Sequence, residues 1–235
     1  MNKYLYNLVW ALVPLALLSQ DNLPTYLVKK SSSDIVISGT GSASQWSEAH
    51  VLTNFVYPWQ SSSPPLTEFR ALWTETHLYF LYRTEDNKII TPERGLGERD
   101  VIDSDRVEIF FKVDDEMNPY YPLEMDSKAR YFDAKGTFYR NVDFEWDWPA
   151  EHIDIKASIQ PNGYTVEGSF TFESLKDLGI YDDDGIIRAG LYRGEYSKKG
   201  NQETEVKWIS WVIPDSEKPD FHIPSSFGLL KLIEK

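Results

Sequence analysis

The chain has 235 residues, of which 41% are hydrophobic and 14% aromatic, and its formal net charge is −13. A chain of this length accommodates one all-β domain with a sizeable core, while the negative charge disfavours nucleic acids and anionic membrane surfaces as partners. Because the sequence contains no cysteine, a disulfide framework, a thiolate metal site and a cysteine nucleophile are excluded.

Residues 1–19 are predicted to be a signal peptide. Lys3 precedes the apolar run Tyr4–Leu18, which is short for a membrane span and typical of an export leader. Ser19 is one of the small residues that a cleavage site needs. We therefore expect a bacterial protein that is secreted or periplasmic, that is not attached to the membrane after leader removal, and that has a single domain over residues 20–235. The alternative is an uncleaved anchor or a misassigned start.

Most of the remaining chain is predicted to be β-strand. Residues 20–45 form a polar lead-in with one short strand at Ile35–Ile37. The runs 67–73 and 78–85 are rich in β-forming residues and separated by turn residues, which predicts a hairpin. The run 106–113 alternates in the period of a strand. Further strands, which bring the total to about ten, are predicted at 152–159, 164–172, 186–196, 207–213 and 228–234.

Turn and helix signals complete the predicted fold. Asn162-Gly163 is a strong hairpin signal because both residues accept positive φ. The one convincing helix begins at Phe172, places Leu175 and Leu178 on one side, and ends at Gly179. The expected fold class is all-β: a two-sheet antiparallel β-sandwich with long loops and one short helix.

The sequence gives little support for a catalytic or zinc centre. With 37 acidic residues, carboxylate pairs of the glycosidase type are expected from number alone. Neither G-x-S-x-G nor H-E-x-x-H occurs, and the four histidines lack metal-ligand spacing. The acidic turns at 114–116 and 182–184 are either solvated or provide oxygen ligands for a structural calcium ion.

The last quarter of the chain combines aromatic rings with polar groups. Trp208 and Trp211 are three residues apart, so in a strand they face opposite ways and only one reaches a given pocket. Phe221 and His222 lie in a loop braced by prolines, which presents them at low entropic cost. Together with Glu108 in the middle of the chain, such residues suit a sugar, which stacks on a ring and hydrogen-bonds to planar polar groups.

Four segments in order resemble the family 9 carbohydrate-binding modules. They are RALWTETHLYFLYRTED, RDVIDSDRVEIFF, YTVEGSFTFESL and PDFHIPSSFGLLKL, within residues 40–233. The family's antiparallel β-sandwich agrees with the strand pattern above. Its members bind sugars and are often attached to xylanases, so the resemblance implies oligosaccharides or polysaccharides as ligands and glycoside hydrolases as partners. It also implies structural calcium, which family members often carry.

The resemblance further implies where the sugar binds. In the family, the sugar lies between two aromatic rings, and the corresponding positions here are Ile102 and Phe221. An aliphatic side chain at position 102 cannot supply a stacking face. Trp146 or Trp148, from a neighbouring loop, is therefore the candidate replacement. Their sequence context is equally compatible with a role in the core or in covering a sheet edge.

The polar residues of this implied site have distinct expected roles. Glu108, in the D-x-V-E-I-F pattern, and Glu124, on the following strand, are expected to accept hydrogen bonds from sugar hydroxyls. Arg99 or Arg193 is expected to donate, and His222 to orient the sugar. The predicted function is non-catalytic carbohydrate binding in an exported protein that supports the breakdown of plant-type polysaccharide, either xylan or glucan.

Three other functions are consistent with the sequence. The first is a polysaccharide hydrolase. The second is a haem-binding sandwich, for which Met125 and His222 are the attractive axial ligands. The third is a purely structural or protein-binding sandwich. Glu108 also has a purely structural interpretation, as a carboxylate buried against Arg106 or Arg193.

Overall fold

The computed structural model describes residues 23–199 and 203–234, so the predicted signal peptide lies outside the described residues. Over these ranges, no helix is long and apolar enough to cross a membrane. The helical elements are α1 (Phe172–Asp177) and the 3-10 turns η2 (Ser44–Ser47), η3 (Gly97–Asp100), η4 (Ala150–His152) and η5 (Pro224–Ser226). The strands are β1 (Thr25–Lys30), β2 (Thr67–Trp73), β3 (His77–Glu85), β4 (Arg106–Lys112), β5 (Tyr120–Asp126), β6 (Tyr131–Asp133), β7 (Lys135–Thr137), β8 (Asn141–Asp143), β9 (Ile153–Gln160), β10 (Gly163–Thr171), β11 (Ile186–Lys199), β12 (Glu203–Ser210) and β13 (Gly228–Ile233).

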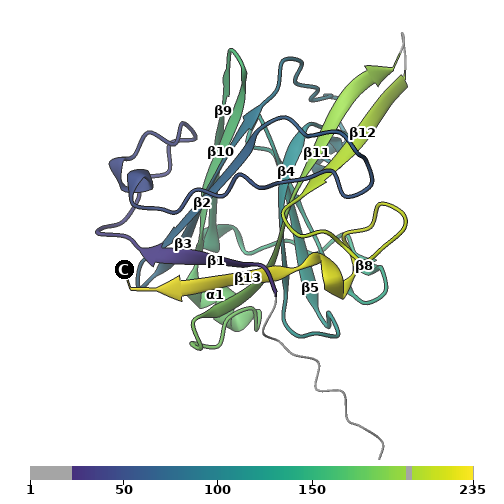
Figure 1. Cartoon of the computed structure of the whole chain (residues 1–235). Helices are drawn as coiled ribbons and strands as arrows, with labels where there is room; N and C mark the ends of the chain where they lie inside the picture. The colour runs from purple at the N-terminus through teal and green to yellow at the C-terminus, as the bar shows by residue number, and fades with distance from the viewer. Residues whose placement is uncertain (1–22, 200–202, 235) are drawn as a thin grey trace, which may run out of the picture.

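The strands belong to one continuous sheet that curls into two layers (Figure 1). One layer has the order β2-β3-β10-β9, and the other contains β5, β4 and β11, with β12 paired to β11. Strand β1 joins the layers, because it pairs in parallel with both β13 and β2. The predicted two-layer all-β fold is confirmed, and the join through β1 is a feature that the sequence did not indicate.

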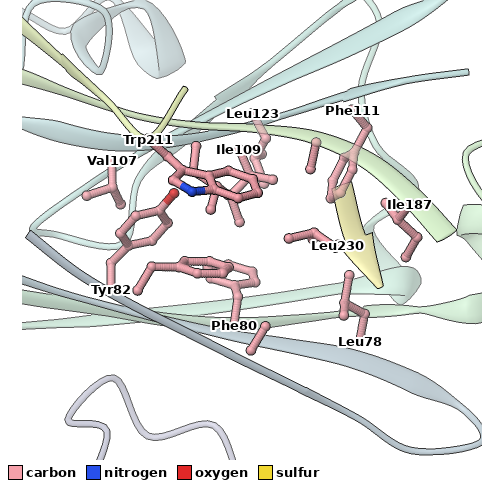
Figure 2. Packing of buried hydrophobic residues seen from close by; sticks show 14 of the residues in the cluster. Leu78, Phe80, Tyr82, Val107, Ile109, Phe111, Leu123, Ile187, Trp211 and Leu230 are labelled. Atoms are coloured by element: carbon pink, nitrogen blue, oxygen red, sulfur yellow. The ribbon is translucent and has the colours of Figure 1, made fainter. Parts of the chain in front are cut away.

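The hydrophobic core fills the space between the layers. Leu78, Phe80 and Tyr82 point inward from β3 toward Val107 and Ile109 of β4 (Figure 2). These side chains are at most 2% exposed, and full burial of a large apolar side chain contributes about 1.5–3 kcal/mol to stability. The core therefore uses only one face of β4, and the side chains on its other face lie outside the space between the layers.

The strand predicted at Ile35–Ile37 is wrong. This segment is irregular, although both isoleucines are buried in a small side cluster with Trp46. The backbone N–H groups just after it are satisfied by a side chain and not by a neighbouring strand: the Glu167 carboxylate accepts from Ser38 at 2.9 Å and from Gly39 at 2.7 Å. A carboxylate from a distant strand is a partner that no local pattern reveals.

The predicted hairpins and helix are confirmed. Strands β9 and β10 pair from Gln160 and Gly163 onward, which leaves Pro161 and Asn162 in the turn. The turn is therefore one residue earlier than the Asn162-Gly163 signal implies, and Asn162 does not have the positive φ on which that signal rests. Helix α1 is followed by Gly179 with a φ of 73°, the left-handed conformation that glycine adopts readily at the end of a helix.

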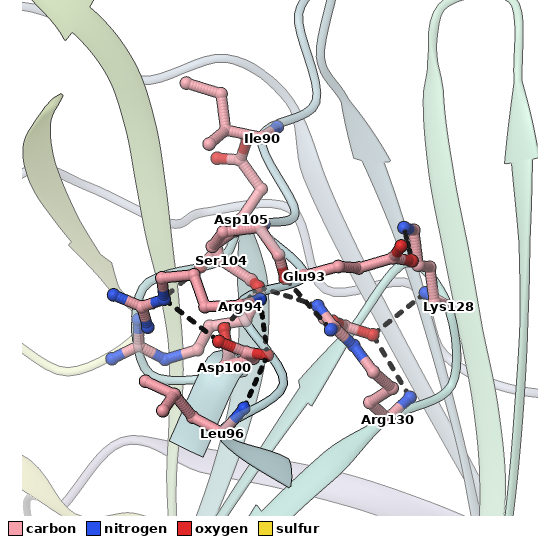
Figure 3. A network of polar contacts seen from close by, with 12 residues as sticks. Ile90, Glu93, Arg94, Leu96, Asp100, Ser104, Asp105, Lys128 and Arg130 are labelled. Atoms are coloured by element: carbon pink, nitrogen blue, oxygen red, sulfur yellow. Dashed lines mark hydrogen bonds and ion pairs between the residues drawn. The ribbon is translucent and has the colours of Figure 1, made fainter. Parts of the chain in front are cut away.

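A polar network fixes the long loop that leads into β4 (Figure 3). The Asp100 carboxylate accepts from the N–H groups of Arg94 and Leu96 at 2.9 and 3.2 Å. The Asp105 carboxylate accepts from the N–H of Ile90 at 2.5 Å. Burial raises the pKa of Asp105 to about 7, against the opposing effect of the Tyr196 and Ile90 N–H groups, which donate to its carboxylate. The network thereby positions the first residues of β4.

Candidate functional site

The outward face of β4 carries polar side chains. Glu108 lies opposite Glu124 of β5 on one side and Tyr192 of β11 on the other. Because successive side chains in a strand alternate between faces, Arg106 and Phe110 share this face with Glu108. Every residue of β4 is buried, so this outward face is covered as thoroughly as the inward one.

A cavity of about 210 Å³ lies on this outward face. Its lining is Ile102, Arg106, Glu108, Phe110, Glu124, Arg140, Trp208, Pro219, Asp220, Phe221 and His222. The volume is below the roughly 300–1,000 Å³ of pockets for drug-sized ligands, so it suits a single small ring. A larger cleft of about 680 Å³ lies near Pro65 and Lys198, but it lacks this cavity's combination of several aromatic rings with buried, perturbed carboxyl groups, which is typical of functional sites.

An arginine between two glutamates forms the floor of the cavity. Arg106 Nε lies 2.9 Å from Glu108 Oε1 and 2.5 Å from Glu124 Oε2, and the three side chains are 4%, 2% and 10% exposed. Burial raises the pKa of Glu108 to about 8; the charge of Glu124 adds to this effect and Arg106 opposes it. Burial also raises the pKa of Glu124, again against Arg106. This buried trio therefore retains a carboxyl proton near neutral pH and can both donate and accept hydrogen bonds.

The guanidinium of Arg106 is held on several sides. Nη1 donates to the main-chain oxygen of Ile102 at 2.5 Å, and Cζ lies 5.2 Å from the ring centroid of Trp208. Gly194 of β11 makes this approach possible, because a Cβ there would lie 3.2 Å from Arg106 Nη1 and 3.3 Å from the Trp208 ring. A larger residue at position 194 would require both side chains to move away from it by a few tenths of an ångström.

Aromatic rings form one wall of the cavity. Phe221 stacks on Tyr192 with centroids 4.0 Å apart and planes at 8°, and Trp208 meets Phe221 edge-on at 5.8 Å. Phe221 is only 6% exposed, whereas Trp208 is half-buried. Trp208 lines the cavity and Trp211 lies in the core, as their spacing predicts.

Hydrogen bonds fix the loop at the edge of the cavity. The Asp220 carboxylate accepts from the Tyr139 hydroxyl at 2.7 Å, Arg140 Nη2 at 2.8 Å and the His222 N–H at 2.9 Å. The Tyr120 hydroxyl lies 2.8 Å from His222 Nδ1. Burial, with a smaller effect of Arg140, lowers the pKa of His222 to about 4 despite the opposing effect of Asp220, so the imidazole is neutral at physiological pH.

The structure brings together four of the eight site residues proposed from the sequence. Glu108, Glu124, Phe221 and His222 all line the cavity. Ile102, the position where the family carries its first ring, lines it as well. The carboxylate of Glu108 both pairs with Arg106 and faces the cavity, so the two roles considered for it coexist.

The other four proposed residues lie elsewhere among the described residues. Arg99 has a side chain that is 61% exposed and lies 3.6 Å from Glu145. Arg193 is fully buried and donates to main-chain oxygen atoms next to β2 and β3. Trp148 is 2% exposed in the core, and Trp146 packs on it with ring centroids 5.9 Å apart. None of these four lines the cavity.

Sequence reasoning missed three polar lining residues as site residues. Arg106 had a usable signal, since it precedes Glu108 by two positions and therefore shares its strand face. Asp220 is adjacent to Phe221 in the sequence. Arg140 had no local signal, because only the folded chain brings it within 2.8 Å of Asp220.

The residue pair considered for haem does not converge. Met125 is fully buried in the core between the layers, whereas His222 lines the cavity on the outward face. The β5-β4-β11 layer separates them, so they cannot ligate one haem iron.

Three other carboxylates form a group that fits a hard divalent cation. Oxygen atoms of Glu98, Asp133 and Asp147 lie within 4.8 Å of one another. Asp133 is 1% exposed, and its Oδ1 has no hydrogen-bond partner, while its Oδ2 accepts from the Trp148 N–H at 2.6 Å. Burial, together with Glu98 and Asp147, raises the pKa of Asp133 to about 6 against that N–H. Oxygen-only ligands favour calcium, which would tie η3, β6 and the segment before η4 together.

The acidic turns considered for calcium each form an ion pair with a lysine. Asp115 lies 3.2 Å from Lys112, and Asp183 lies 2.8 Å from Lys176. In both turns a lysine of the chain supplies the positive charge. The carboxylates of the Asp133 group, in contrast, have no ion-pair partner within the described ranges, so this group fits the implied calcium better.

Fold and cavity together define a small-ligand binding domain: a two-layer β-sandwich with a pocket of aromatic, carboxyl and guanidinium groups on the outside of one layer. The family model described as "Carbohydrate family 9 binding domain-like" matches residues 37–235, and the chain belongs to this family. No relative among curated proteins matches the chain.

Three solved structures share the fold. A family 9 module from Caldicellulosiruptor kristjanssonii in complex with glucose aligns with a TM-score of 0.60 and 16% identity, over 90% of this chain and 97% of that one. A family 9 module from the same organism with cellotriose gives 0.59 and 14%, over 90% and 95%. A protein from Bacteroides uniformis, described as a candidate carbohydrate-binding protein, gives 0.67 and 16%, over 90% and 100%.

Proposed function

We propose that the chain is a non-catalytic carbohydrate-binding domain whose cavity takes one ring of a neutral sugar. The observation that carries this proposal is the buried trio of Arg106, Glu108 and Glu124 beside the aromatic surfaces of Trp208 and Phe221. A pyranose needs both features, because its ring face is apolar and its hydroxyls demand hydrogen-bond partners.

The polar groups have complementary roles in this proposal. Glu108 retains a proton near neutral pH and can donate to one sugar hydroxyl while accepting from another. Arg140 supplies donors at the edge of the cavity. A hydrogen bond that involves a charged group contributes about 1.5–3 kcal/mol, so two or three of them suffice for specific recognition of one ring.

Family membership and the complexes of related modules with glucose and cellotriose support this assignment. Glucose and gluco-oligosaccharides are therefore the first ligands to test, with xylo-oligosaccharides next. We further propose that the protein is exported and that it binds xylan or glucan of plant type alongside glycoside hydrolases. The leader-like residues 1–19 support export.

The arrangement of the two carboxyls favours binding over hydrolysis. Glycosidases place their two carboxyl groups on opposite sides of the scissile bond, roughly 5–9.5 Å apart. Here Glu108 and Glu124 contact the same Arg106 Nε atom. Both acids therefore lie on the floor of the cavity, on one side of any bound ring.

A glycan array followed by titration calorimetry tests the proposed function. The protein should bind neutral sugars, and its affinity should change little between low and high salt, because no counterions are released. Trp208→Ala should weaken binding by about 1–3 kcal/mol, whereas the matched variant Trp146→Ala, also a half-buried tryptophan, should not. Binding to no neutral sugar, or equal losses in both variants, would refute the proposal.

A further inference from the structure

Two large aromatic side chains stand exposed in the turn between β7 and β8. Phe138 and Tyr139 are 52% and 56% exposed, with ring centroids 5.3 Å apart. Turns usually carry glycine, proline, asparagine, aspartate or serine, and grouped exposed apolar surface marks a place of interaction. Their position relative to the cavity decides what that interaction is.

Hydrogen bonds connect the turn to Asp220, a residue of the cavity wall. The Tyr139 hydroxyl and Arg140 Nη2 donate to the two oxygen atoms of this carboxylate at 2.7 and 2.8 Å. Asp220 and Arg140 both line the cavity. The ring of Tyr139 therefore lies one hydrogen bond away from the cavity wall.

Part of the exposed rim of the cavity belongs to this turn. Its floor residues, such as Glu108, are nearly fully buried, whereas Arg140 has a side chain that is 46% exposed and Pro219 is exposed. A ligand that is longer than the cavity must leave on the exposed side. Because Arg140 belongs to the turn between β7 and β8, one such path passes Phe138 and Tyr139.

The ring of Tyr139 is held in place before any ligand arrives. Its hydroxyl is bound by Asp220, and Arg140 Cζ lies 5.8 Å from its ring centroid. A contact surface that is already ordered loses little conformational entropy on binding. More than half of its surface nevertheless remains open.

We propose that Phe138 and Tyr139 form a second sugar subsite, which takes the next ring of an oligosaccharide whose terminal ring occupies the cavity. The inference rests on the proposed function, because it requires a sugar in the cavity. It adds that the domain prefers oligosaccharides to single sugars, since the volume of about 210 Å³ suits only one ring.

Calorimetric titration with two matched ligand pairs tests this subsite: glucose with cellotriose, and xylose with xylotriose. In the pair that binds, the trisaccharide should bind the wild-type chain roughly tenfold more tightly than the monosaccharide, the effect of one aromatic contact. Phe138→Ala should remove most of that gain and leave the monosaccharide affinity unchanged. Tyr139→Phe retains the ring and should retain the gain, although loss of its hydrogen bond to Asp220 can weaken both ligands alike.

The outcomes separate this inference from the function on which it rests. If monosaccharide and trisaccharide bind equally well to the wild-type chain, the cavity binds sugar but the second subsite is refuted. Equal weakening of both ligands by Phe138→Ala, in a variant that melts like the wild type, also refutes it. If neither pair binds, the proposed function fails and the subsite fails with it.

Discussion

Two groups of carboxyls, one fully buried and one with only Asp133 buried, differ in the positive charge that balances them. Glu108 and Glu124 enclose the guanidinium of Arg106, which the chain itself supplies. Asp133 lies with Glu98 and Asp147 and has no ion-pair partner in the described part of the chain. In the first group the positive charge comes from the chain itself, and our proposal is that this group receives a neutral molecule with hydroxyls. The second would be completed by a cation from solution.

The first group contributes little to the stability of the fold. Burial of ionised groups costs several kcal/mol each, and an ion pair does not fully recover that cost. Apolar residues on the outward face of β4 would serve stability at least as well. The presence of three ionisable side chains on a cavity floor is therefore better explained by recognition than by folding.

Removal of Arg106 should have the largest effect, because it leaves the first group without its cation. We expect Arg106→Met to lower the free energy of unfolding by about 3–5 kcal/mol, the usual effect of breaking a buried ion pair. The triple variant with Glu108→Gln and Glu124→Gln should recover part of this loss. Urea unfolding measures both changes, and Arg99→Met, at an exposed position, should stay within about 0.5 kcal/mol of wild type. A triple variant no more stable than Arg106→Met would contradict the account.

Calcium should have the next largest effect, through the second group. At a free concentration about a hundredfold above Kd, binding should stabilise the fold by about 2.7 kcal/mol, a rise in Tm of roughly 5–10 °C. Asp133→Asn should abolish the rise, whereas Asp182→Asn, in the exposed acidic turn, should retain it. Melting curves with calcium and with a chelator measure this effect. Loss of the rise in the Asp182 variant alone would place the cation in the turn.

The raised pKa of Glu108 should give a smaller effect that depends on pH. Between the usual pKa of a glutamate and about 8, the folded protein holds a proton that the unfolded chain releases. Stability therefore falls as pH rises through this window, with a slope of at most about 1.4 kcal/mol per pH unit.

Glu108→Gln isolates this contribution. The variant cannot titrate at position 108, so its Tm should rise relative to wild type between pH 6 and pH 9, while the contribution of Asp105 is common to both proteins and cancels. Thermal melts of both proteins across this range measure the difference. A Tm difference that stays constant with pH would show that Glu108 is ionised throughout.

Much of the fold was predictable from local patterns. Strand β4 was found because Val107, Ile109 and Phe111 alternate with other residues, and the turn at Pro161 and Asn162 because of its residue types. The join through β1 was not, since parallel pairing with β13 connects segments about 200 residues apart. Short-range sequence patterns do not carry such pairings.

The site was predictable only where local motifs mark its residues. Glu108 and Phe221 were found through motifs that resemble a family, and these motifs mark positions along single strands and loops. Arg140 belongs to the cavity only because the turn after β7 folds back against Asp220. Arg193 was proposed as a donor, but its face on β11 points into the space between the layers, where it is fully buried. Which face a side chain takes depends on register, and register is set by the whole sheet.

The central claim is that the cavity on the outward face of β4 binds a sugar ring, and nuclear magnetic resonance tests it most directly. In ¹⁵N-labelled protein titrated with the sugar that binds best on the array, the indole N–H signal of Trp208 should shift. The signals of Trp148 and Trp211, which lie in the core, should stay in place. A Trp208 signal that no sugar moves, or a bound sugar that shifts only residues away from the cavity, would contradict the account.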